Sequence, residues 1–382
     1  MSRPLQGCRV LDLGIITAGA ATSALLADLG AEVIKVESPG YRDPFRKWIG
    51  PRADAGEDSP FFRFTNRGKQ GVSIDLKRPE GRDVFLRLVE RSDIVVENFR
   101  RGVMAQLGVD YPVLRRARPE IILASLSSHG ESGPDKDRVS FGTTLEAMAG
   151  LAWETGYAGD VPVVTGRDLN YPDQVVALFA AGMVLTAWLA RQRGNGGVHL
   201  DLSQRELTSF LLGERFVQRG AGERAGNADD LYALQECFVG RDGRWLALSV
   251  SQYRRERLAA LVGGAVTQTL DERVAQWVGA RDRDDAVSSL CDSGLACAPV
   301  LDASEAMAQR GTLWRHALVS LSDGSLAKGF PFQFDEQPMR LQGDAPTIGR
   351  DTAEVLQRVA GYSADEVEIL ARQGVIECGA TP

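Results

Sequence analysis

The chain has 382 residues, and its 44 lysines and arginines are outnumbered by 51 aspartates and glutamates, which leaves a formal net charge of −7 at pH 7. This length favours two domains over one, and the diffuse negative charge argues against a surface dedicated to nucleic acid. Five scattered cysteines and three histidines show neither a disulfide framework nor the spacing of a metal site. Because no targeting segment is recognisable, we expect a cytoplasmic protein without metal, membrane or nucleic-acid partners.

The first forty residues predict a βαβ unit. Its parts are a short apolar strand over 8–13, a tight turn of small residues over 17–21, a helix over 23–29 and a strand over 31–37. Such a unit builds a parallel sheet, whose ligands lie beyond the carboxyl ends of the strands. Gly14 and Gly19 lie at that edge, but they form neither the three-glycine dinucleotide fingerprint nor a phosphate-binding loop. NAD and ATP are therefore poor ligand candidates.

Basic residues flank the strands that follow. Further strands are predicted over 71–76, 92–97 and 120–125, with a helix over 81–90. The basic residues are Arg67, Lys69 and Lys77 around the first of these strands, and Arg100 and Arg101 after Asn98 and Phe99. Arginine and lysine neutralise phosphate oxygens, and an aromatic ring can cover a purine. These clusters favour a nucleotide with several phosphates; the alternative is that they are solvated surface charges.

Asp173 follows Tyr171 and Pro172 and opens a run, 174–190, that holds no charged residue until Arg191. Proline favours the first turn of a helix, and an aspartate beside it meets free N–H groups and the positive end of the helix dipole. We predict a helix that is apolar on nearly all sides and hence buried, and that is too short for a bilayer, which takes about 20 apolar residues. Two interpretations of Asp173 stay open: a residue that caps a core helix, or a catalytic nucleophile.

The rest of the chain predicts a smaller module and a returning tail. The predicted elements are a turn over 194–197, a strand over 198–202, a linker over 219–230, a strand over 245–250, helices over 254–262 and 272–278, a strand over 328–334, and helices over 352–359 and 363–372. We therefore predict an α/β protein with a large Rossmann-like, parallel-sheet domain (1–218), a smaller α+β domain (219–310) and a C-terminal segment (311–382) that returns to the large domain.

Several short motifs follow one another in a fixed order. They are RVLDLG at 9–14, LGAEVIKVE at 29–37, NRGK at 66–69, DLK at 75–77, VENFR at 96–100, GNGGVHLDLS at 194–203, RW at 244–245, APV at 298–300 and APTIG at 345–349. In order and spacing they resemble the class III CoA-transferases, the family of formyl-CoA:oxalate and carnitine CoA-transferases and α-methylacyl-CoA racemase. The resemblance runs nearly end to end and implies a two-domain subunit in an interlocked homodimer.

The resemblance also implies a catalytic role for Asp173, which stands where the family has its catalytic aspartate. Its carboxylate would attack the thioester of an acyl-CoA and form a mixed anhydride, then an aspartyl-CoA thioester, before the acceptor acid reverses these steps. Thr17, Ala18 and Gly19 occupy the family's loop near the thioester, so their backbone N–H groups are the oxyanion candidates. Coenzyme A and acyl-CoA are then substrates, and no permanently bound cofactor is expected.

The CoA-contacting positions of the family can be carried over one by one. They fall on Ile74, Lys77, Asn98, Phe99 and Arg100, and Arg67, Lys69 and Arg101 are further phosphate candidates. Ser38 and Gln106 stand where relatives often carry arginine, so part of the phosphate clamp is absent or is taken over by Arg42, Arg46 or Arg101.

Acyl specificity departs from formyl-CoA transferase. Thr17 replaces a glutamine of that enzyme, whose glycine-rich loop has no counterpart near Gly226. Oxalate and formate are therefore poor substrate candidates, and the chain looks more like the branch that uses succinyl-CoA with larger organic acids.

Three other functions stay open. An acyl-CoA racemase needs a histidine opposite the aspartate for proton exchange, but that position is Phe141 here, although His129 lies nearby in the sequence. An intramolecular CoA isomerase would use the same aspartate. The third is a non-catalytic CoA-binding subunit of a heteromeric transferase, against which the retention of Asp173 argues.

Overall fold

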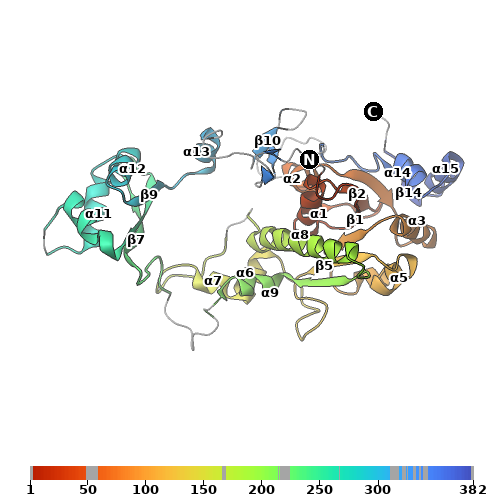
Figure 1. The fold of residues 1–382 in the computed structure, drawn as a ribbon, viewed down its shortest axis with the longest axis horizontal. Coiled ribbons are helices and arrows are strands. Elements are labelled where there is room, and N and C mark those ends of the chain that lie inside the picture. The colour runs from red at the N-terminus through yellow and green to blue at the C-terminus, as the bar shows by residue number, and fades with distance from the viewer. Residues whose placement is uncertain are drawn as a thin grey trace. The chain divides into compact units, whose positions relative to one another are not determined.

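The computed structural model describes residues 3–48, 59–165, 169–213, 215, 224–265, 267–309, 318–320, 324, 326–329, 333–334, 337–338 and 343–379. The chain divides into two compact units (Figure 1). Unit 1 comprises Met1–Leu151, Val164–Phe216 and His316–Pro382, and unit 2 comprises Ala152–Val163 and Val217–Arg315. The domain boundaries predicted at 218/219 and 310/311 lie outside the described residues.

Unit 1 is built on a seven-stranded sheet. Its strands, in spatial order, are β14 (Ile376–Glu377), β3 (Gln70–Ile74), β2 (Glu32–Glu37), β1 (Arg9–Asp12), β4 (Ile94–Glu97), β5 (Ile122–Ser127) and β6 (His199–Ser203). Every pairing is parallel except that of β14 with β3. The six strands predicted up to residue 202 are confirmed. The strand order reverses between β1 and β4, where sheets of this type bind ligands beyond their carboxyl ends.

Helices cover both faces of this sheet. The helices of unit 1 are α1 (Ala18–Asp28), α2 (Pro60–Asn66), α3 (Pro79–Glu90), α4 (Val103–Gln106), α5 (Tyr111–Ala117), α6 (Gly142–Ala149), α8 (Tyr171–Gln192), α9 (Gln204–Phe210), α14 (Thr352–Arg358) and α15 (Ala364–Arg372), with a 3-10 helix η1 (Pro44–Lys47). Val10 of β1 packs in one apolar cluster with Leu26 of α1 and Val176 of α8. Its neighbour Leu11 packs in a second cluster with Phe85 of α3. Because both faces are buried, the strands are apolar without alternation.

Helix α1 begins at Ala18, so the tight turn predicted over 17–21 is wrong, while the helix predicted over 23–29 is confirmed and longer. The small residues serve a close contact instead of a turn. A Cβ on Gly14, in the loop after β1, would lie 2.5 Å from the carbonyl carbon of Gly19. The glycines therefore let the first turn of α1 pack directly on this loop.

Helix α8 differs from the prediction in burial and in length. Its buried face packs on α1 and β5, but Leu178, Phe179, Met183 and Leu189 on its other side are 43% to 51% exposed. At 22 residues it is also long and apolar enough, by length and composition, to cross a membrane, and it is the one such helix in the described part of the chain. A core helix meets the same criterion, so this is weak grounds for a membrane span.

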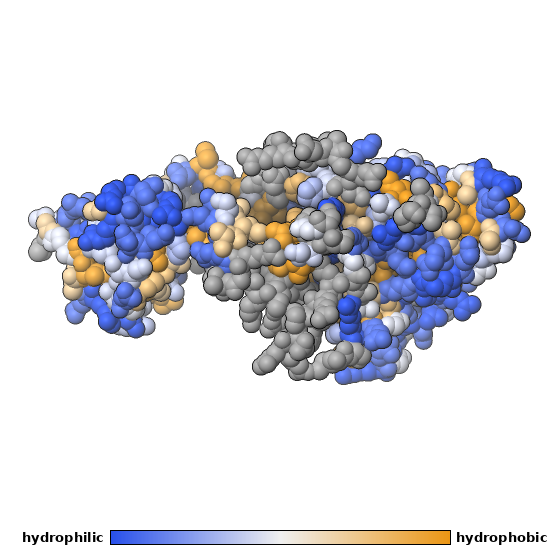
Figure 2. Space-filling model, turned by 90° about the horizontal axis from the view of Figure 1, so that it is seen from above, coloured by the Kyte–Doolittle hydropathy of each residue, from blue (hydrophilic) through white to orange (hydrophobic). Residues whose placement is uncertain are grey.

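Unit 2 contains an antiparallel sheet of β7 (Tyr232–Val239), β8 (Trp245–Ser251) and β9 (Ala296–Pro299). Its helices are α10 (Arg255–Val262), α11 (Leu270–Gly279), α12 (Arg283–Asp292) and α13 (Ala303–Ala308), with η3 (Gln252–Arg254) and the last three residues of α7 (Leu151–Glu154). One apolar cluster joins sheet and helices. Hydrophilic residues cover most of the face of this unit seen in Figure 2. The strand predicted over 245–250 and the helices predicted over 254–262 and 272–278 are confirmed, whereas β7, β9, α12 and α13 were not predicted.

The segment Ala152–Val163 lies with unit 2 because Arg224 binds it. The Arg224 guanidinium lies 4.9 Å from the ring centre of Trp153 and donates hydrogen bonds to the carbonyl oxygens of Asp160 and Val161. Arg224 belongs to the linker predicted over 219–230, of which residues 219–223 lie outside the described residues. An irregular polar stretch thus contributes to the packing of this unit.

The C-terminal part contains two short hairpins, β10 (Leu318–Ser320) with β11 (Leu326–Lys328), and β12 (Gln333–Phe334) with β13 (Gln337–Pro338). The strand predicted over 328–334 therefore covers the last residue of β11 and the whole of β12, and residues 330–332 between them lie outside the described residues. The helices predicted over 352–359 and 363–372 are confirmed as α14 and α15. Both helices and β14 belong to unit 1, where β14 pairs with β3 and the helices join its apolar core.

Candidate active site

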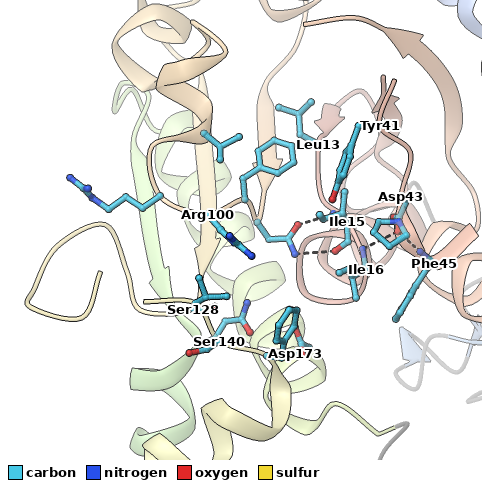
Figure 3. Close-up of a pocket in the computed structure, with 18 of the residues that line it drawn as sticks. Leu13, Ile15, Ile16, Tyr41, Asp43, Phe45, Arg100, Ser128, Ser140 and Asp173 are labelled. Carbon is cyan, nitrogen blue, oxygen red and sulfur yellow. Dashed lines mark hydrogen bonds between the residues drawn. The ribbon is translucent and has the colours of Figure 1, made fainter. Parts of the chain in front are cut away.

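A pocket of about 1230 Å³ lies in unit 1 at the carboxyl edge of the parallel sheet (Figure 3). Residues that follow five neighbouring strands line it, namely Ile15, Ser38, Lys77, Asn98 and Ser128. This is the edge at which sheets of this class bind ligands, because loops from several strands converge there. The pocket is therefore the candidate active site.

Asp173 reaches this pocket from the first turn of α8. Burial raises the pKa of its carboxyl to about 6, and the hydrogen bond from its own backbone N–H opposes that rise. In the described part of the chain no basic side chain pairs with it, so a half-buried carboxylate stands without a counter-ion. Groups with such shifted pKa values in clefts are often functional, and this carboxylate remains mostly ionised at pH 7.

The first turn of α6 faces the Asp173 carboxylate. A Cβ built on Gly142 would lie 3.3 Å from Asp173 Oδ2 and 3.3 Å from Asn170 Oδ1. Glycine at this position leaves the carboxylate open to a reacting group. The sequence offered no signal for Gly142, because α6 and α8 meet only in the folded chain.

The pocket gathers most of the predicted CoA-contacting residues. Ile74, Lys77, Asn98, Phe99, Arg100 and Arg101 all line it. Arg67 and Lys69 do not: Arg67 pairs with Asp28 at 2.5 Å, and Lys69 pairs with Asp12 at 2.7 Å, all four side chains being buried. Burial lowers the pKa of Lys69 to about 8. These two cations precede β3 and hold the inside of the unit together instead of facing the pocket.

The remaining predicted residues, Thr17, Ala18 and Gly19, are buried at the start of α1. They follow Ile15 and Ile16, which line the pocket. They are not themselves part of the pocket wall. Their backbone N–H groups belong to the first turn of α1, where intrahelical partners are missing.

The loop between β1 and α1 is held by polar side chains. The N–H groups of Gly14, Ile15 and Ile16 donate to Asp12 (2.8 Å), Asn98 (2.7 Å) and Asp43 (3.1 Å) respectively. These polar side chains leave none of the three N–H groups free for a ligand.

Backbone strain gathers at the pocket. Ile16 (φ 60°) and Asn170 (φ 46°) are the non-glycine residues of the described chain with positive φ, and both line the pocket. Each such conformation costs on the order of 1–3 kcal/mol and tends to occur at functional sites.

The substitutes for the expected phosphate clamp lie in different places. Ser38 lines the pocket, whereas Gln106 does not. Arg42 pairs with Glu377 at 3.2 Å, and Arg46 binds the buried Glu37 through its Nε at 2.9 Å. Arg101 is thus the candidate of the three that lines the pocket. The sequence did not indicate Lys136, a further cation of the wall.

Exposed aromatic side chains complete the wall. Tyr41, Trp48 and Phe141 are 55%, 48% and 66% exposed, yet all three line the pocket. They come from irregular segments with no periodicity, so no local pattern marked Tyr41 or Trp48, and Phe141 was noted only as the position of a racemase's histidine. Together with the cations they suit a ligand that has both anionic and apolar parts.

Phe141 stands where a racemase would carry its histidine, and His129 also lines the pocket. His129 Nε2 lies 2.7 Å from Ser140 Oγ. Burial, followed by the charge of Arg205, lowers the pKa of His129. Its other ring nitrogen is buried without a partner, so it is not presented to the pocket as a base. Among the described residues no group of three His, Cys, Asp or Glu side chains could hold a metal ion.

Comparison with known proteins gives a consistent family. The model of a family described as CoA-transferase family III matches residues 5–352. A probable CoA-transferase of Mycobacterium tuberculosis is 31% identical over 98% of this chain, which spans 50% of that protein. The alpha subunit of succinyl-CoA–L-malate CoA-transferase from Chloroflexus aurantiacus is 28% identical over 98% of this chain and 92% of its own length.

A further relative is succinate–glutarate CoA-transferase from Agrobacterium fabrum, which is 29% identical over 92% of this chain and 95% of its own length. Among solved structures, a CAIB/BAIF family protein from Brucella suis has a TM-score of 0.84 and 25% identity, covering 94% of this chain and 100% of its own.

Proposed function

The chain belongs to CoA-transferase family III and is an enzyme of this class, and we propose that it transfers coenzyme A from an acyl-CoA donor to a carboxylic acid through covalent intermediates on Asp173. One observation carries this proposal. The Asp173 carboxylate is half-buried, has no basic partner in the described chain, and shares a pocket with Lys77, Asn98 and Arg100. A carboxylate that is partly removed from water without a basic partner costs folding free energy. Its presence at the pocket, where the starts of α6 and α8 meet, therefore points to a role in the chemistry.

The first step forms a mixed anhydride. The Asp173 carboxylate attacks the thioester carbonyl of the donor and expels the CoA thiolate. A carboxylate is a weak nucleophile in water, but desolvation and positioning make it competent. With a pKa of about 6 the group is mostly ionised at pH 7, so no further base is needed.

Two exchanges then complete the transfer. The thiolate attacks the aspartyl carbonyl, which releases the donor acid and leaves an aspartyl-CoA thioester. The acceptor carboxylate attacks this thioester, again forming an anhydride and thiolate. The thiolate finally attacks the acceptor's carbonyl, which gives the new acyl-CoA and restores Asp173.

Backbone N–H groups are the proposed oxyanion donors. Thr17, Ala18 and Gly19 at the start of α1 remain candidates, and Gly142 at the start of α6 adds a second helix start that directly faces Asp173. Helix starts favour developing negative charge because their N–H groups are unpaired and their dipoles are aligned.

The pocket's cations are the proposed contacts for CoA. Lys77 and Arg100 would bind phosphate, with Arg101 and Lys136 in place of the missing clamp arginines, and Phe99 would cover the adenine. All five line the pocket. Arg67 and Lys69 would act only indirectly, since both side chains are used in buried ion pairs.

Succinyl-CoA with a larger organic acid is the substrate pair we propose. The relatives named for succinyl-CoA with L-malate and for succinate with glutarate support it. A homodimer with interlocked chains is proposed from the resemblance to the family. Racemisation is less favoured, because Phe141 offers no base opposite Asp173.

The test is a trapping experiment. The protein is incubated with a panel of acyl-CoA donors, including succinyl-CoA, and treated with hydroxylamine, which captures an activated carboxyl as a hydroxamate. Peptide mapping by mass spectrometry should place the modification on Asp173. Modification of another residue, or continued acyl exchange without any modified peptide, would overturn the proposed mechanism.

A further inference from the structure

Lys35 forms an ion pair with Asp43, a residue of the pocket wall, and the proposed reaction does not use this pair. Their charged groups lie 3.1 Å apart, and both side chains are 0% exposed. Such buried pairs add little net stability, because the loss of hydration offsets the attraction between the charges. The backbone groups that these two side chains bind indicate a role other than stabilising the core.

The pair grips both ends of the segment 14–16. Lys35 Nζ donates to the carbonyl oxygen of Gly14 as well as to Asp43 Oδ2. Asp43 Oδ1 accepts the N–H of Ile16 at 3.1 Å, and also that of Phe45 at 2.9 Å. Figure 3 shows the contact between Asp43 and Ile16 at the wall of the pocket.

Asp43 is itself fixed in place. Its backbone N–H donates to Glu37 Oε1 at 2.9 Å, and the Arg46 guanidinium binds the same buried carboxylate. The Asp43 carboxylate therefore cannot follow Ile16 if the segment moves. An anchored acceptor of this kind imposes a position on the N–H group that it binds.

Ile16 needs to be held. It has φ 60°, in the left-handed region that β-branched residues rarely adopt, and it lies directly before Thr17, the cap residue of α1. Such a conformation persists only where surrounding contacts enforce it. Without those contacts, Ile16 would return to an ordinary backbone conformation and carry the start of α1 with it.

We infer that Lys35 and Asp43 are positioning residues for the transfer reaction: together they hold Ile16 in its left-handed conformation and so fix the pocket wall and the start of α1 relative to Asp173. This inference rests on the proposed function. Both side chains are 0% exposed, so the pair should act on the rate of the covalent steps more than on the binding of CoA.

The variant Lys35→Met/Asp43→Ala removes both charges together and leaves no buried ion without a partner. We expect a kcat about 10- to 100-fold lower, since a displacement of about 1 Å can cost about 100-fold, with little change in the KM of the donor. Amide hydrogen exchange at Ile16, followed by mass spectrometry of overlapping peptides, should become faster.

Arg191→Met/Asp93→Ala is the matched control. This pair is also mostly buried, at 2.8 Å, and Asp93 likewise accepts a backbone N–H, that of Arg9, but neither residue lines the pocket. The control should lose stability without the loss in kcat. Equal kcat losses in the two variants, or unchanged exchange at Ile16 in the first, would overturn the inference.

A second background separates positioning from general damage. Glycine adopts φ 60° freely, so in the Ile16→Gly background the loss of the pair should lower kcat less than in the parental chain. An equal loss in both backgrounds would contradict the role. If the parental protein exchanged no acyl group with any donor, the proposed function would fail, while hydrogen exchange at Ile16 would still decide whether the pair holds this segment.

Discussion

The side-chain amide of Asn98 binds the backbone of Ile15 from both sides: its Oδ1 accepts the Ile15 N–H at 2.7 Å, and its Nδ2 donates to the Ile15 carbonyl at 3.0 Å. Asn98 follows β4 and Ile15 follows β1, so this pair joins the two loops at the point where the strand order reverses. The amide thus binds the N–H and the carbonyl of one residue, as a neighbouring strand would do in a sheet.

Replacing Asn98 by aspartate should therefore damage both the loop and catalysis. The new carboxylate still accepts the Ile15 N–H, but its second oxygen faces the Ile15 carbonyl and repels it. Leaving that acceptor without a donor costs about 1–3 kcal/mol. The midpoint temperature of thermal unfolding, Tm, and the kcat of acyl exchange should both fall. An unchanged kcat with lowered stability would mean that the loop does not contribute to the chemistry.

The variant Asp173→Asn distinguishes a catalytic role of Asp173 from a structural role at the start of α8. Asp173 lies in the first turn of α8, whose cap residue is Asn170, and asparagine has nearly the same shape as aspartate, so the folded structure should be retained. The exchange rate should fall by roughly 10³-fold or more. A raised carboxyl pKa means that the fold loses stability as the pH rises toward 6 and that the full cost of the ionised group is present above this pH. At pH 8 the variant should therefore be at least as stable as the parent. The measurements are kcat and Tm, with mass spectrometry to exclude deamidation. Parental turnover would eliminate Asp173 as the nucleophile.

The pH dependence of kcat/KM should show the titration of Asp173. Because the ionised form attacks, the rate should rise through pH 6 and level off above it. Burial also raises the pKa of Glu97 to about 7, and this carboxyl accepts the N–H of Phe99 at 2.7 Å. The profile is therefore measured again in Glu97→Gln. A midpoint near 6 that persists in this variant belongs to Asp173, and its loss would assign the profile to Glu97.

A methyl group at Gly142 should obstruct the nucleophile. The added Cβ of Gly142→Ala would lie 3.3 Å from Asp173 Oδ2, closer than ordinary van der Waals contact. We therefore expect kcat to fall by at least about 10-fold. Gly182→Ala in α8 is the control, because nothing lies within 4 Å of its added Cβ. The control should gain up to about 1 kcal/mol of helix stability and keep its kcat. Equal activity of the two variants would show that Gly142 is not near the reacting atoms.

The strands of the parallel sheet could be predicted because their signal is local. Val33, Ile34 and Val36 in β2, like Val95 and Val96 in β4, form short apolar runs that suit strands buried on both faces. The small residues after β1 carry a weaker signal, since a tight turn and a close helix contact both favour them. Only the position of Gly14 against Gly19 distinguishes the two.

At the site, the local sequence pattern was enough to place Asp173 at the start of a helix and several basic residues after strands. Whether a charge faces the pocket or the interior depended on its partners: Lys69 meets Asp12, 57 residues away in sequence, while Lys77 lines the pocket. Tertiary structure likewise decided three other features: the exposure of one side of α8, the position of Gly142 opposite Asp173, and the left-handed conformation of Ile16. The physical reason is that burial, ion pairing and backbone strain arise from contacts between distant segments, which no local stretch of sequence encodes.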